Sequence, residues 1–333
     1  MNPQTGLTKA KKLVERDNVQ MIAGVISSAV AYSVADYLKA QKVLLFLNNA
    51  GADDLTKQRF SPYIFRNSFA NSQMVFVLGE WAYKQGYRKA AALATDYAAG
   101  YEYMGGFAKT FTDAGGRIVQ EQYPPLGAAD PSPFVSAVSS DADFIFAFHT
   151  GADALRFVKA YDQYGVKKRL PIIGFSSLAD ESILPQEGDA ALGLKTSAMW
   201  TAGLDTPANK TFMDAFKKKF NRDATFGAAT GYEGAMMLDK ALQAVNGNIE
   251  DKDAFVAAME KVEVTNSPRG TVKFDKYHNA ILNVYITEVK KVDGKLVNTV
   301  IETYKDVSQF WKWSPEEFMK MPLFAEMKGK WAK

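Results

Sequence analysis

The chain has no cysteine and only two histidines among its 333 residues. The absence of cysteine excludes disulfide bonds, thiol catalysis and cysteine-ligated metals, although it does not identify a compartment. No stretch approaches the ~20 apolar residues that a membrane-spanning helix needs, so the chain is not expected to span a membrane. The net charge of +3 is small for this length, and lysines and arginines are interleaved with acidic residues, so no nucleic-acid partner is expected.

Motifs for catalysis, metals and nucleotides are missing or incomplete. A nucleophile elbow needs Gly-x-Ser-x-Gly at a strand-to-helix turn, and the segment 174–178 lacks the final glycine. His149 and His278 are far apart and show no metal-ligand spacing. No Walker loop is present, and no Gly-x-Gly-x-x-Gly opens a helix. The sequence therefore predicts no catalytic residue, no metal site and no cofactor.

What the chain does contain is an alternation of apolar strands and amphipathic helices. Continuous apolar runs separated by helices indicate buried parallel strands joined by crossovers. The pattern predicts strands at 19–25, 43–47, 89–95, 118–122, 143–148 and 170–174. It predicts helices at 3–14, 29–39, 72–85, 101–113, 133–139 and 152–164.

The alternation ends after residue 200. Three helices are then predicted nearly in succession, at 207–220, 231–245 and 251–262, followed by β-type segments at 271–274, 282–289 and 296–304. A chain of this length is unusually long for a single core. We therefore expect an α/β protein with two lobes, each built on a doubly wound parallel sheet.

Candidate binding residues follow from the rule that ligands bind beyond the carboxyl ends of the strands of open α/β sheets. The residues at these ends are small, hydroxylic or aromatic: Ser27, Ser28, Asn49, Ala50, Gly51, Tyr101, His149, Thr150, Phe175 and Ser176. A serine at a helix N-terminus suits a ligand carboxylate, because unpaired N–H groups and a positive partial charge lie there. The alternatives are helix capping for Ser28, ordinary packing for Tyr101 and a structural role for His149. Together the set indicates binding without chemistry.

The order of several short segments carries a family resemblance. The segments are Ala10 with Leu13-Val14, Val19–Gly24 leading into Ser27-Ser28, Phe65-Arg66, Asp96 before Tyr101-Glu102, Asp143-Phe144-Ile145, Gly174, Gly231–Ala235 and Gly270–Asp275. The chain resembles type I periplasmic solute-binding proteins of ABC importers, in the leucine/isoleucine/valine-binding branch, over essentially its whole length. The segment Phe310–Pro315 also resembles members that bind aromatic or other hydrophobic acids.

The resemblance implies two lobes that close on a ligand in the cleft, with chain crossings near Phe69, Ser197 and Lys276. Lobe 1 would comprise residues 1–69 and 198–276, and lobe 2 residues 70–197 and 277–333. In the family, positions matching Ser28, Asn49 and Gly51 hold the ligand carboxylate. Positions matching Thr150 and Ser176 face the cleft from the other lobe.

One departure from the family bears on the ligand. Amino-acid binders of this branch carry a glutamate at the position of Ser176, where it pairs with the ligand ammonium. An unpaired buried ammonium costs several kcal/mol, which disfavours an amino acid. A small carboxylate with an uncharged, aromatic or otherwise hydrophobic body fits better.

A second departure concerns the start of the chain. Family members begin with a signal peptide followed by a strand, a helix and a strand, whereas this sequence begins with a helix and shows no signal. An incorrect start site, a gene fragment or an expression boundary would explain the difference. The full-length protein is expected in the periplasm, or outside the cytoplasm more generally.

The sequence therefore favours a receptor rather than an enzyme. Its expected partners are a small-molecule carboxylate and the permease of an ABC importer, and monomers are usual in the family. Two alternatives remain open: a cytoplasmic ligand-sensing regulator with the same fold, and a hydrolase that would use His149 or Ser176.

Overall fold

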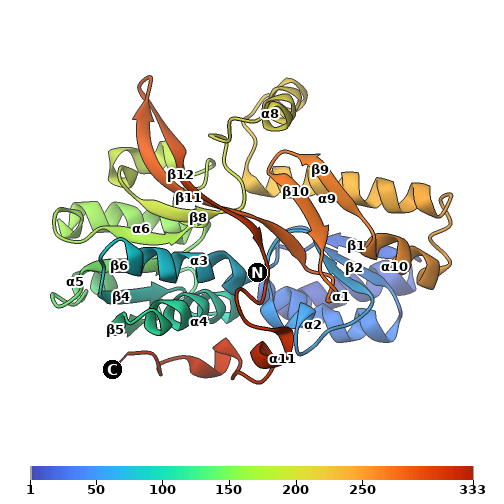
Figure 1. Ribbon diagram of the computed structural model, residues 1–333, viewed down its shortest axis with the longest axis horizontal. Helices are drawn as coiled ribbons and strands as arrows, with labels where there is room; N and C mark the ends of the chain where they lie inside the picture. Colours follow the sequence, from blue (N-terminus) through green and yellow to red (C-terminus); the bar gives the residue numbers. More distant parts are fainter. Residues whose placement is uncertain (1, 333) are drawn as a thin grey trace. The chain divides into compact units, whose positions relative to one another are not determined.

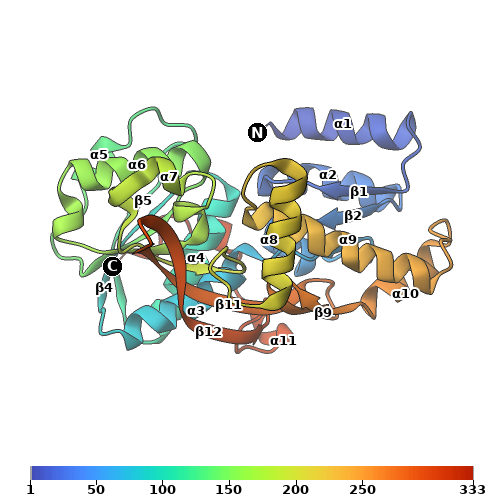
Figure 2. The same cartoon turned by 90° about the horizontal axis from the view of Figure 1, so that it is seen from above.

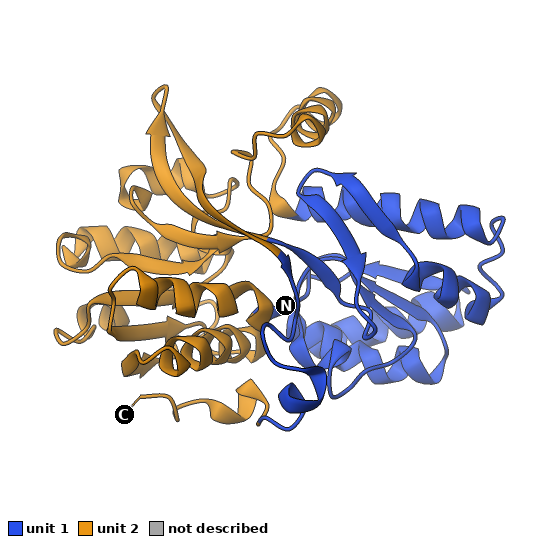
Figure 3. Cartoon of the chain, in the orientation of Figure 1, with its two compact units in different colours: residues 1–71, 227–283, 306–321 blue, residues 72–226, 284–305, 322–333 orange. Residues whose placement is uncertain are grey.

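The computed structural model describes residues 2–332, which form two compact α/β units (Figure 3). Unit 1 contains Met1–Asn71, Gly227–Asn283 and Asp306–Met321. Unit 2 contains Ser72–Phe226, Val284–Lys305 and Pro322–Lys333. Within residues 2–332, no helix is both long and apolar enough to cross a membrane.

Unit 1 contains a parallel three-stranded sheet with two helices on one face. The strands, in sheet order, are β1 (Met21–Gly24), β2 (Leu44–Leu47) and β3 (Ile64–Arg66). Apolar side chains of α2 (Ser28–Ala40) pack against β2, because Val34 and Leu38 share a buried cluster with Leu45 and Leu47. The N-terminal helix α1 (Pro3–Glu15) lies alongside α2 (Figure 2).

The later segments of unit 1 form an antiparallel ladder and three helices. The helices are α9 (Phe226–Ala244), α10 (Lys252–Glu260) and α11 (Pro315–Phe318). A short 3-10 turn, η1 (Asp53–Thr56), lies earlier in the chain, between β2 and β3. The ladder contains β9 (Glu263–Ser267), β10 (Gly270–Phe274) and the first residues of β11 (Ala280–Val292). Segment 306–321 belongs to this unit because the Gln309 amide donates to the Thr56 carbonyl at 3.0 Å and to the Asp275 carboxylate at 2.8 Å.

Unit 2 is built on a larger sheet. Its parallel strands, in sheet order, are β5 (Arg117–Gln122), β4 (Lys89–Ala94), β6 (Phe144–Phe148), β7 (Ile172–Phe175) and β8 (Lys195–Ala198). The rest of β11 pairs antiparallel with β8, and β12 (Lys295–Val307) pairs with β11. The ribbon shows β11 and β12 as a long hairpin (Figure 1).

Both faces of the parallel part of this sheet are covered. The helices of unit 2 are α3 (Asn71–Lys84), α4 (Ala98–Asp113), α5 (Ser132–Ser136), α6 (Gly151–Gln163), α7 (Leu184–Glu187) and α8 (Pro207–Phe220). The 3-10 turns are η2 (Val166–Lys168), η3 (Ser176–Ala179), η4 (Gly188–Ala191) and η5 (Phe324–Met327). On one face Phe107 of α4 stacks on Phe146 with 4.0 Å between the ring centroids. On the other, Ile145 shares a buried cluster with Phe157 of α6, as expected for parallel strands.

The predicted strands and helices are confirmed, and the α/β class with parallel-sheet lobes is confirmed with them. Three strands were not predicted: β3, β8 and β9. They span three to five residues and have mixed composition, so they show no usable hydrophobic period. Their partner strands, rather than their own sequence, define them.

The compact units group four segments differently from the lobes inferred from the sequence. Residues 198–226 group with unit 2, and residues 70–71, 277–283 and 306–321 group with unit 1. The first grouping has a visible cause, because the Thr201 hydroxyl donates to the Asn298 carbonyl at 3.0 Å and the Ala202 N–H donates to Glu181 at 3.2 Å. These bonds tie the segment after β8 to other parts of unit 2.

Candidate functional site

The first strand of unit 1 ends in an unusual backbone conformation. Gly24 has φ +110°, and the next residue, Val25, has φ +62°. A β-branched residue in this left-handed region is an outlier, and such strain clusters at functional sites. Beyond it, Ile26 is 74% exposed, whereas Ser27 and Ser28 are buried at the start of α2.

Ser27 occupies the N-cap position of α2 but makes no side-chain capping bond. The N–H groups of the first helical turn have no carbonyl partner within their own helix. They therefore remain donors for an anion at the carboxyl end of β1.

The turn after β2 is tied to the same place. The Asn48 N–H donates to the Gly24 carbonyl at 3.3 Å, and the Ala50 N–H donates to the Val25 carbonyl at 2.9 Å. The structure thus brings the predicted turn Asn49–Gly51 against the segment that leads into Ser28. Neighbouring parallel strands end at the same edge of a sheet, and that explains the juxtaposition.

Asn71, which the sequence did not single out, connects Ser28 with Gly51. Its backbone N–H donates to the Gly51 carbonyl at 2.9 Å, and its side-chain Nδ2 donates to the Ser28 Oγ at 3.1 Å. Both Ser28 and Asn71 are buried. Because its oxygen accepts from Asn71, the Ser28 hydroxyl keeps its own proton for another acceptor.

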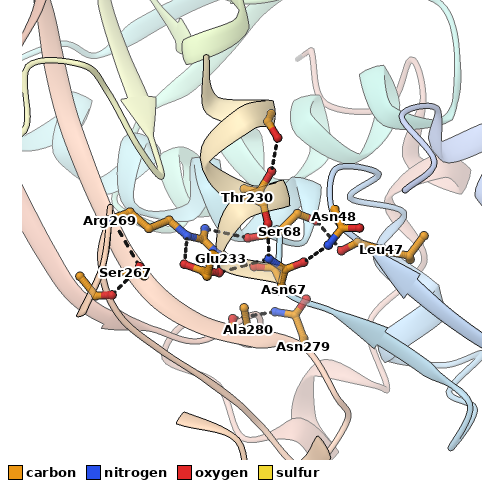
Figure 4. A network of polar contacts seen from close by, with 12 residues as sticks. Leu47, Asn48, Asn67, Ser68, Thr230, Glu233, Ser267, Arg269, Asn279 and Ala280 are labelled. Carbon is orange, nitrogen blue, oxygen red and sulfur yellow. Dashed lines mark hydrogen bonds and ion pairs between the residues drawn. The ribbon is translucent and has the colours of Figure 1, made fainter. Parts of the chain in front are cut away.

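A buried polar network supports this edge from the side of α9 (Figure 4). The Asn48 amide donates to the Asn67 Oδ1 at 2.8 Å, and the Asn67 amide donates to the Thr230 carbonyl at 2.8 Å and to Glu233 at 3.2 Å. Arg269 forms a bidentate ion pair with Glu233 at 2.8 and 2.6 Å. Arg269 is 1% exposed and Glu233 is 0% exposed, so the pair is fully buried.

In unit 2, the ends of β4 and β6 are joined by a histidine. The Thr95 Oγ1 and the His149 Nδ1 are hydrogen-bonded at 2.8 Å. Burial lowers the pKa of His149 to about 3, so the ring is neutral at physiological pH. Its other ring nitrogen, Nε2, is buried and has no hydrogen-bond partner within residues 2–332.

Two buried serine hydroxyls at neighbouring strand ends also lack a hydrogen-bond partner within residues 2–332. These are the Oγ atoms of Ser176 and Ser197. Ser176 directly follows β7, and Ser197 pairs with Phe175 in the β7–β8 ladder. Buried polar atoms are rarely left unsatisfied, so each is a candidate contact for a bound molecule.

Aromatic rings surround these strand ends. The Phe175 ring lies 4.7 Å from the Tyr103 ring, which stacks on Phe148 at 3.9 Å. Thr150 follows β6 and is the N-cap residue of α6. The structure therefore brings His149, Thr150, Phe175 and Ser176 to adjacent strand ends of unit 2.

Tyr101 lies in a separate cluster. Its hydroxyl donates to Asp96 at 2.6 Å, and the Lys328 ammonium lies 4.8 Å from the centre of its ring. The ring also contacts Tyr123, with centroids 5.7 Å apart. Contact between Tyr101 and a ligand stays a prediction.

The hydrolase alternative depends on His149 as a base and on a serine at the end of β7 as a nucleophile. The His149 Nδ1 bonds Thr95, and Ser177 donates its hydroxyl to the His149 backbone carbonyl at 2.6 Å. A serine nucleophile needs a hydrogen bond to its base, and a base with a pKa near 3 takes up protons poorly at neutral pH. Within residues 2–332, neither the Ser176 hydroxyl nor the Ser177 hydroxyl is hydrogen-bonded to the His149 ring.

The residues that sequence reasoning missed are polar groups whose partners are distant in the chain. Asn71, Asn67, Glu233, Arg269 and Ser197 belong to this set. The only local signal was the segment Gly231–Ala235, which contains Glu233 and contributed to the family resemblance.

Two α/β units whose strand ends offer unpaired N–H groups, hydroxyls and aromatic rings define a ligand-binding protein of the periplasmic binding class. The sequence profile described as "Periplasmic binding protein" matches residues 1–295, and the chain belongs to this family. The protein is the solute-binding component of an ABC importer. Family membership implies a location outside the cytoplasm.

Individual relatives agree with this assignment. The chain is 31% identical over 311 residues to "Leu/Ile/Val-binding protein homolog 6" of Brucella melitensis, covering 91% of this chain and 79% of that protein. An ABC transporter substrate-binding protein from Sphaerobacter thermophilus shares 36% identity with a TM-score of 0.87, over 92% of this chain and 85% of that one. A solute-binding protein from Rhodopseudomonas palustris HaA2, solved with p-hydroxybenzoic acid, shares 33% identity with a TM-score of 0.87, over 93% and 84% of the two chains.

Proposed function

We propose that the solute is a small aromatic carboxylic acid whose carboxylate binds at the edge of unit 1 formed by Ser28, the first turn of α2 and the turn Asn49–Gly51. The observation that carries the proposal is the buried Ser28 hydroxyl, which accepts a hydrogen bond from Asn71 and retains its proton at the N-terminus of a 13-residue helix. A hydroxyl donor beside unpaired helical N–H groups favours a carboxylate over a neutral or cationic group.

The strand ends of unit 2 support an aromatic body with a further polar group. Phe175 and Thr150 would contact the ring, and the unpartnered atoms of His149 and Ser176 would bond a ring hydroxyl. No carboxylate stands at position 176, where an ammonium would need one. Two related solute-binding proteins were solved with p-hydroxybenzoic acid and with 3,4-dihydroxybenzoic acid.

The proposal includes the protein's setting. It would act in the periplasm as a monomer, releasing the acid to the permease of its importer without chemical change. The neutral His149, whose Nδ1 is bonded to Thr95, supports binding rather than turnover.

A thermal-shift screen followed by calorimetric titration tests the proposed ligand class. Benzoate, 4-hydroxybenzoate, aliphatic acids, leucine and phenylalanine would form the panel. We expect stabilisation by the aromatic acids, and a larger shift with 4-hydroxybenzoate than with benzoate because the hydroxyl would satisfy His149 and Ser176. At 100 Kd of ligand, the gain in stability is about 2.7 kcal/mol.

Two other results would contradict this proposal. Stabilisation by leucine or phenylalanine alone would show that an ammonium is accommodated without a carboxylate at position 176. Hydrolysis of 4-hydroxybenzoate esters or amides, abolished by replacing His149 or Ser176, would indicate an enzyme instead.

Replacing Ser28 by alanine should weaken binding of the preferred acid by about 1–3 kcal/mol, because one hydrogen bond to a charged group is lost. Isothermal titration calorimetry at pH 7 measures the change. Ser33→Ala is a matched control in the same helix, since the Ser33 hydroxyl donates to the backbone carbonyls of Val30 and Pro3. Equal affinity of Ser28→Ala and wild type would remove Ser28 from the site.

A further inference from the structure

Asn71 is the first residue of α3 and the last residue of unit 1 before the chain enters unit 2. It is 2% exposed and therefore lies inside the protein. Of its contacts, two reach the two halves of the proposed carboxylate site: the Gly51 carbonyl accepts from its backbone, and the Ser28 hydroxyl accepts from its side chain. One residue thus joins elements that are 43 positions apart in the sequence.

The Asn71 side chain also explains why position 51 is a glycine. A Cβ atom on Gly51 would lie 2.1 Å from the Asn71 side-chain Oδ1 and 3.0 Å from the Asn71 backbone nitrogen. The space that a side chain would need is therefore filled by the Asn71 amide. Only glycine, which has no Cβ, lets the turn backbone approach Asn71 this closely.

The direction of the bond to Ser28 has a chemical consequence. A serine hydroxyl has one proton and two lone pairs. Because Asn71 occupies one lone pair, the hydroxyl keeps its proton and one lone pair for a ligand. Its proton bonds a carboxylate oxygen more strongly than the neutral oxygen of an amide, because the carboxylate is charged.

From these contacts we infer that Asn71 is the positioning residue that gives this edge its preference for a carboxylate over the corresponding neutral amide. The inference rests on the proposed function, because it assumes that Ser28 and Gly51 bind the acid. Asn71 acts through Ser28 and Gly51 and is not required to touch the ligand.

The test compares the binding of 4-hydroxybenzoate with that of 4-hydroxybenzamide in wild type and in Asn71→Asp. Aspartate has nearly the same size and remains suitable at a helix N-terminus, but it accepts where asparagine donates and adds a negative charge. We expect the variant to lose at least about 100-fold in affinity for the acid, since like charges in a desolvated site repel. The affinity for the amide should change much less, so the ratio of the two affinities collapses.

Asn71→Ser is the second variant, in case a buried carboxylate prevents folding. Serine is also suitable at a helix N-terminus, but it is too short to reach Ser28. The acid-over-amide ratio should again fall, by about tenfold. Asn279→Asp is the matched control: Asn279 is buried in unit 1, and its Oδ1 accepts from Arg66 at 2.6 Å. The acid-over-amide affinity ratio of Asn279→Asp should equal that of wild type.

A double-substitution cycle provides an independent readout. Gly51→Ala alone should displace the Asn71 side chain and weaken acid binding. In an Asn71→Ala background it should cost less, because the 2.1 Å clash with the Asn71 Oδ1 is removed and only the 3.0 Å approach to the backbone nitrogen remains. Additive losses would show that the two positions act separately and would overturn the inference.

The outcomes separate the inference from the proposed function. A wild-type protein that does not bind 4-hydroxybenzoate contradicts the proposed function, and the inference falls with it. A wild-type protein that binds the acid selectively, together with Asn71 variants that fold and keep the full acid-over-amide ratio, overturns the role of Asn71 alone.

Discussion

Replacing Arg269 by methionine is expected to lower the free energy of unfolding by about 3–5 kcal/mol, because the change leaves the Glu233 carboxylate buried without its cation. Both side chains are essentially inaccessible to solvent, and their bidentate bonds measure 2.8 and 2.6 Å. Arg269 also donates to the Ser68 carbonyl at 3.0 Å. Urea denaturation followed by circular dichroism at pH 7 would measure the loss.

The control for this prediction uses the same replacement at an exposed pair. Arg59→Met removes an ion pair with Asp36, and it should cost about 0–1 kcal/mol because water screens that pair. The double variant Arg269→Met/Glu233→Met should recover most of the stability lost by Arg269→Met, since no buried charge remains. If the single variant matched wild type, the buried pair would have no net role in stability.

Loss of the pair should also weaken ligand binding. Glu233 accepts from Asn67, and Asn67 accepts from Asn48 at the end of β2. If the polar network of Asn48, Asn67 and Glu233 reorganises, the turn Asn49–Gly51 that follows Asn48 will be less well positioned. The double variant therefore offers a second readout: restored stability with reduced affinity for 4-hydroxybenzoate would show that the network positions the turn in addition to stabilising the fold.

A second large effect is expected from the pH dependence of unit 2. Burial, and to a smaller extent the charge of Asp180, raises the pKa of Glu187 from 4.5 to about 8, against the opposing effect of Lys159. Glu187 is 4% exposed, and both of its carboxyl oxygens lack a hydrogen-bond partner within residues 2–332. The folded protein therefore retains a proton on Glu187 at neutral pH that the unfolded chain has released.

The sign of the resulting dependence follows from proton uptake. Because the folded state binds more protons between pH 4.5 and about 8, stability decreases as the pH rises through this window. The full contribution of Glu187 is about 5 kcal/mol, at 1.36 kcal/mol for each unit of pKa shift, and about 4 kcal/mol of it is lost by pH 8, where the folded-state carboxyl is half-ionised.

Glu187→Gln should remove this contribution. Glutamine resembles the protonated acid, so the variant and wild type should have similar stabilities near pH 5, and the variant should be more stable by about 4 kcal/mol near pH 8. Urea denaturation at several pH values measures the difference, with Glu250→Gln as an exposed control that should follow wild type throughout. Parallel curves for Glu187→Gln and wild type would show that Glu187 is ionised in the folded state.

The sequence determined most of the secondary structure and the location of the strand ends. Runs such as 43–47 and 143–148 are apolar at every position, so burial on both faces followed from composition alone. The positions of Ser28, Gly51, His149 and Ser176 after such runs were predicted for the same reason. The proposed chemical class of the ligand came from Ser176 together with the family resemblance, which implies a glutamate at this position in amino-acid binders.

What the tertiary structure alone decided is which polar groups meet. Asn71 contacts Ser28 across 43 positions, and Arg269 contacts Asn67 across 202. The short strand β8 exists because β7 and β11 pair with it on either side. Hydrophobic periodicity is a local property that a sequence displays directly. The pairing of buried polar groups depends on how separate elements pack, because each such group must find a partner in the fold wherever that partner lies in the chain.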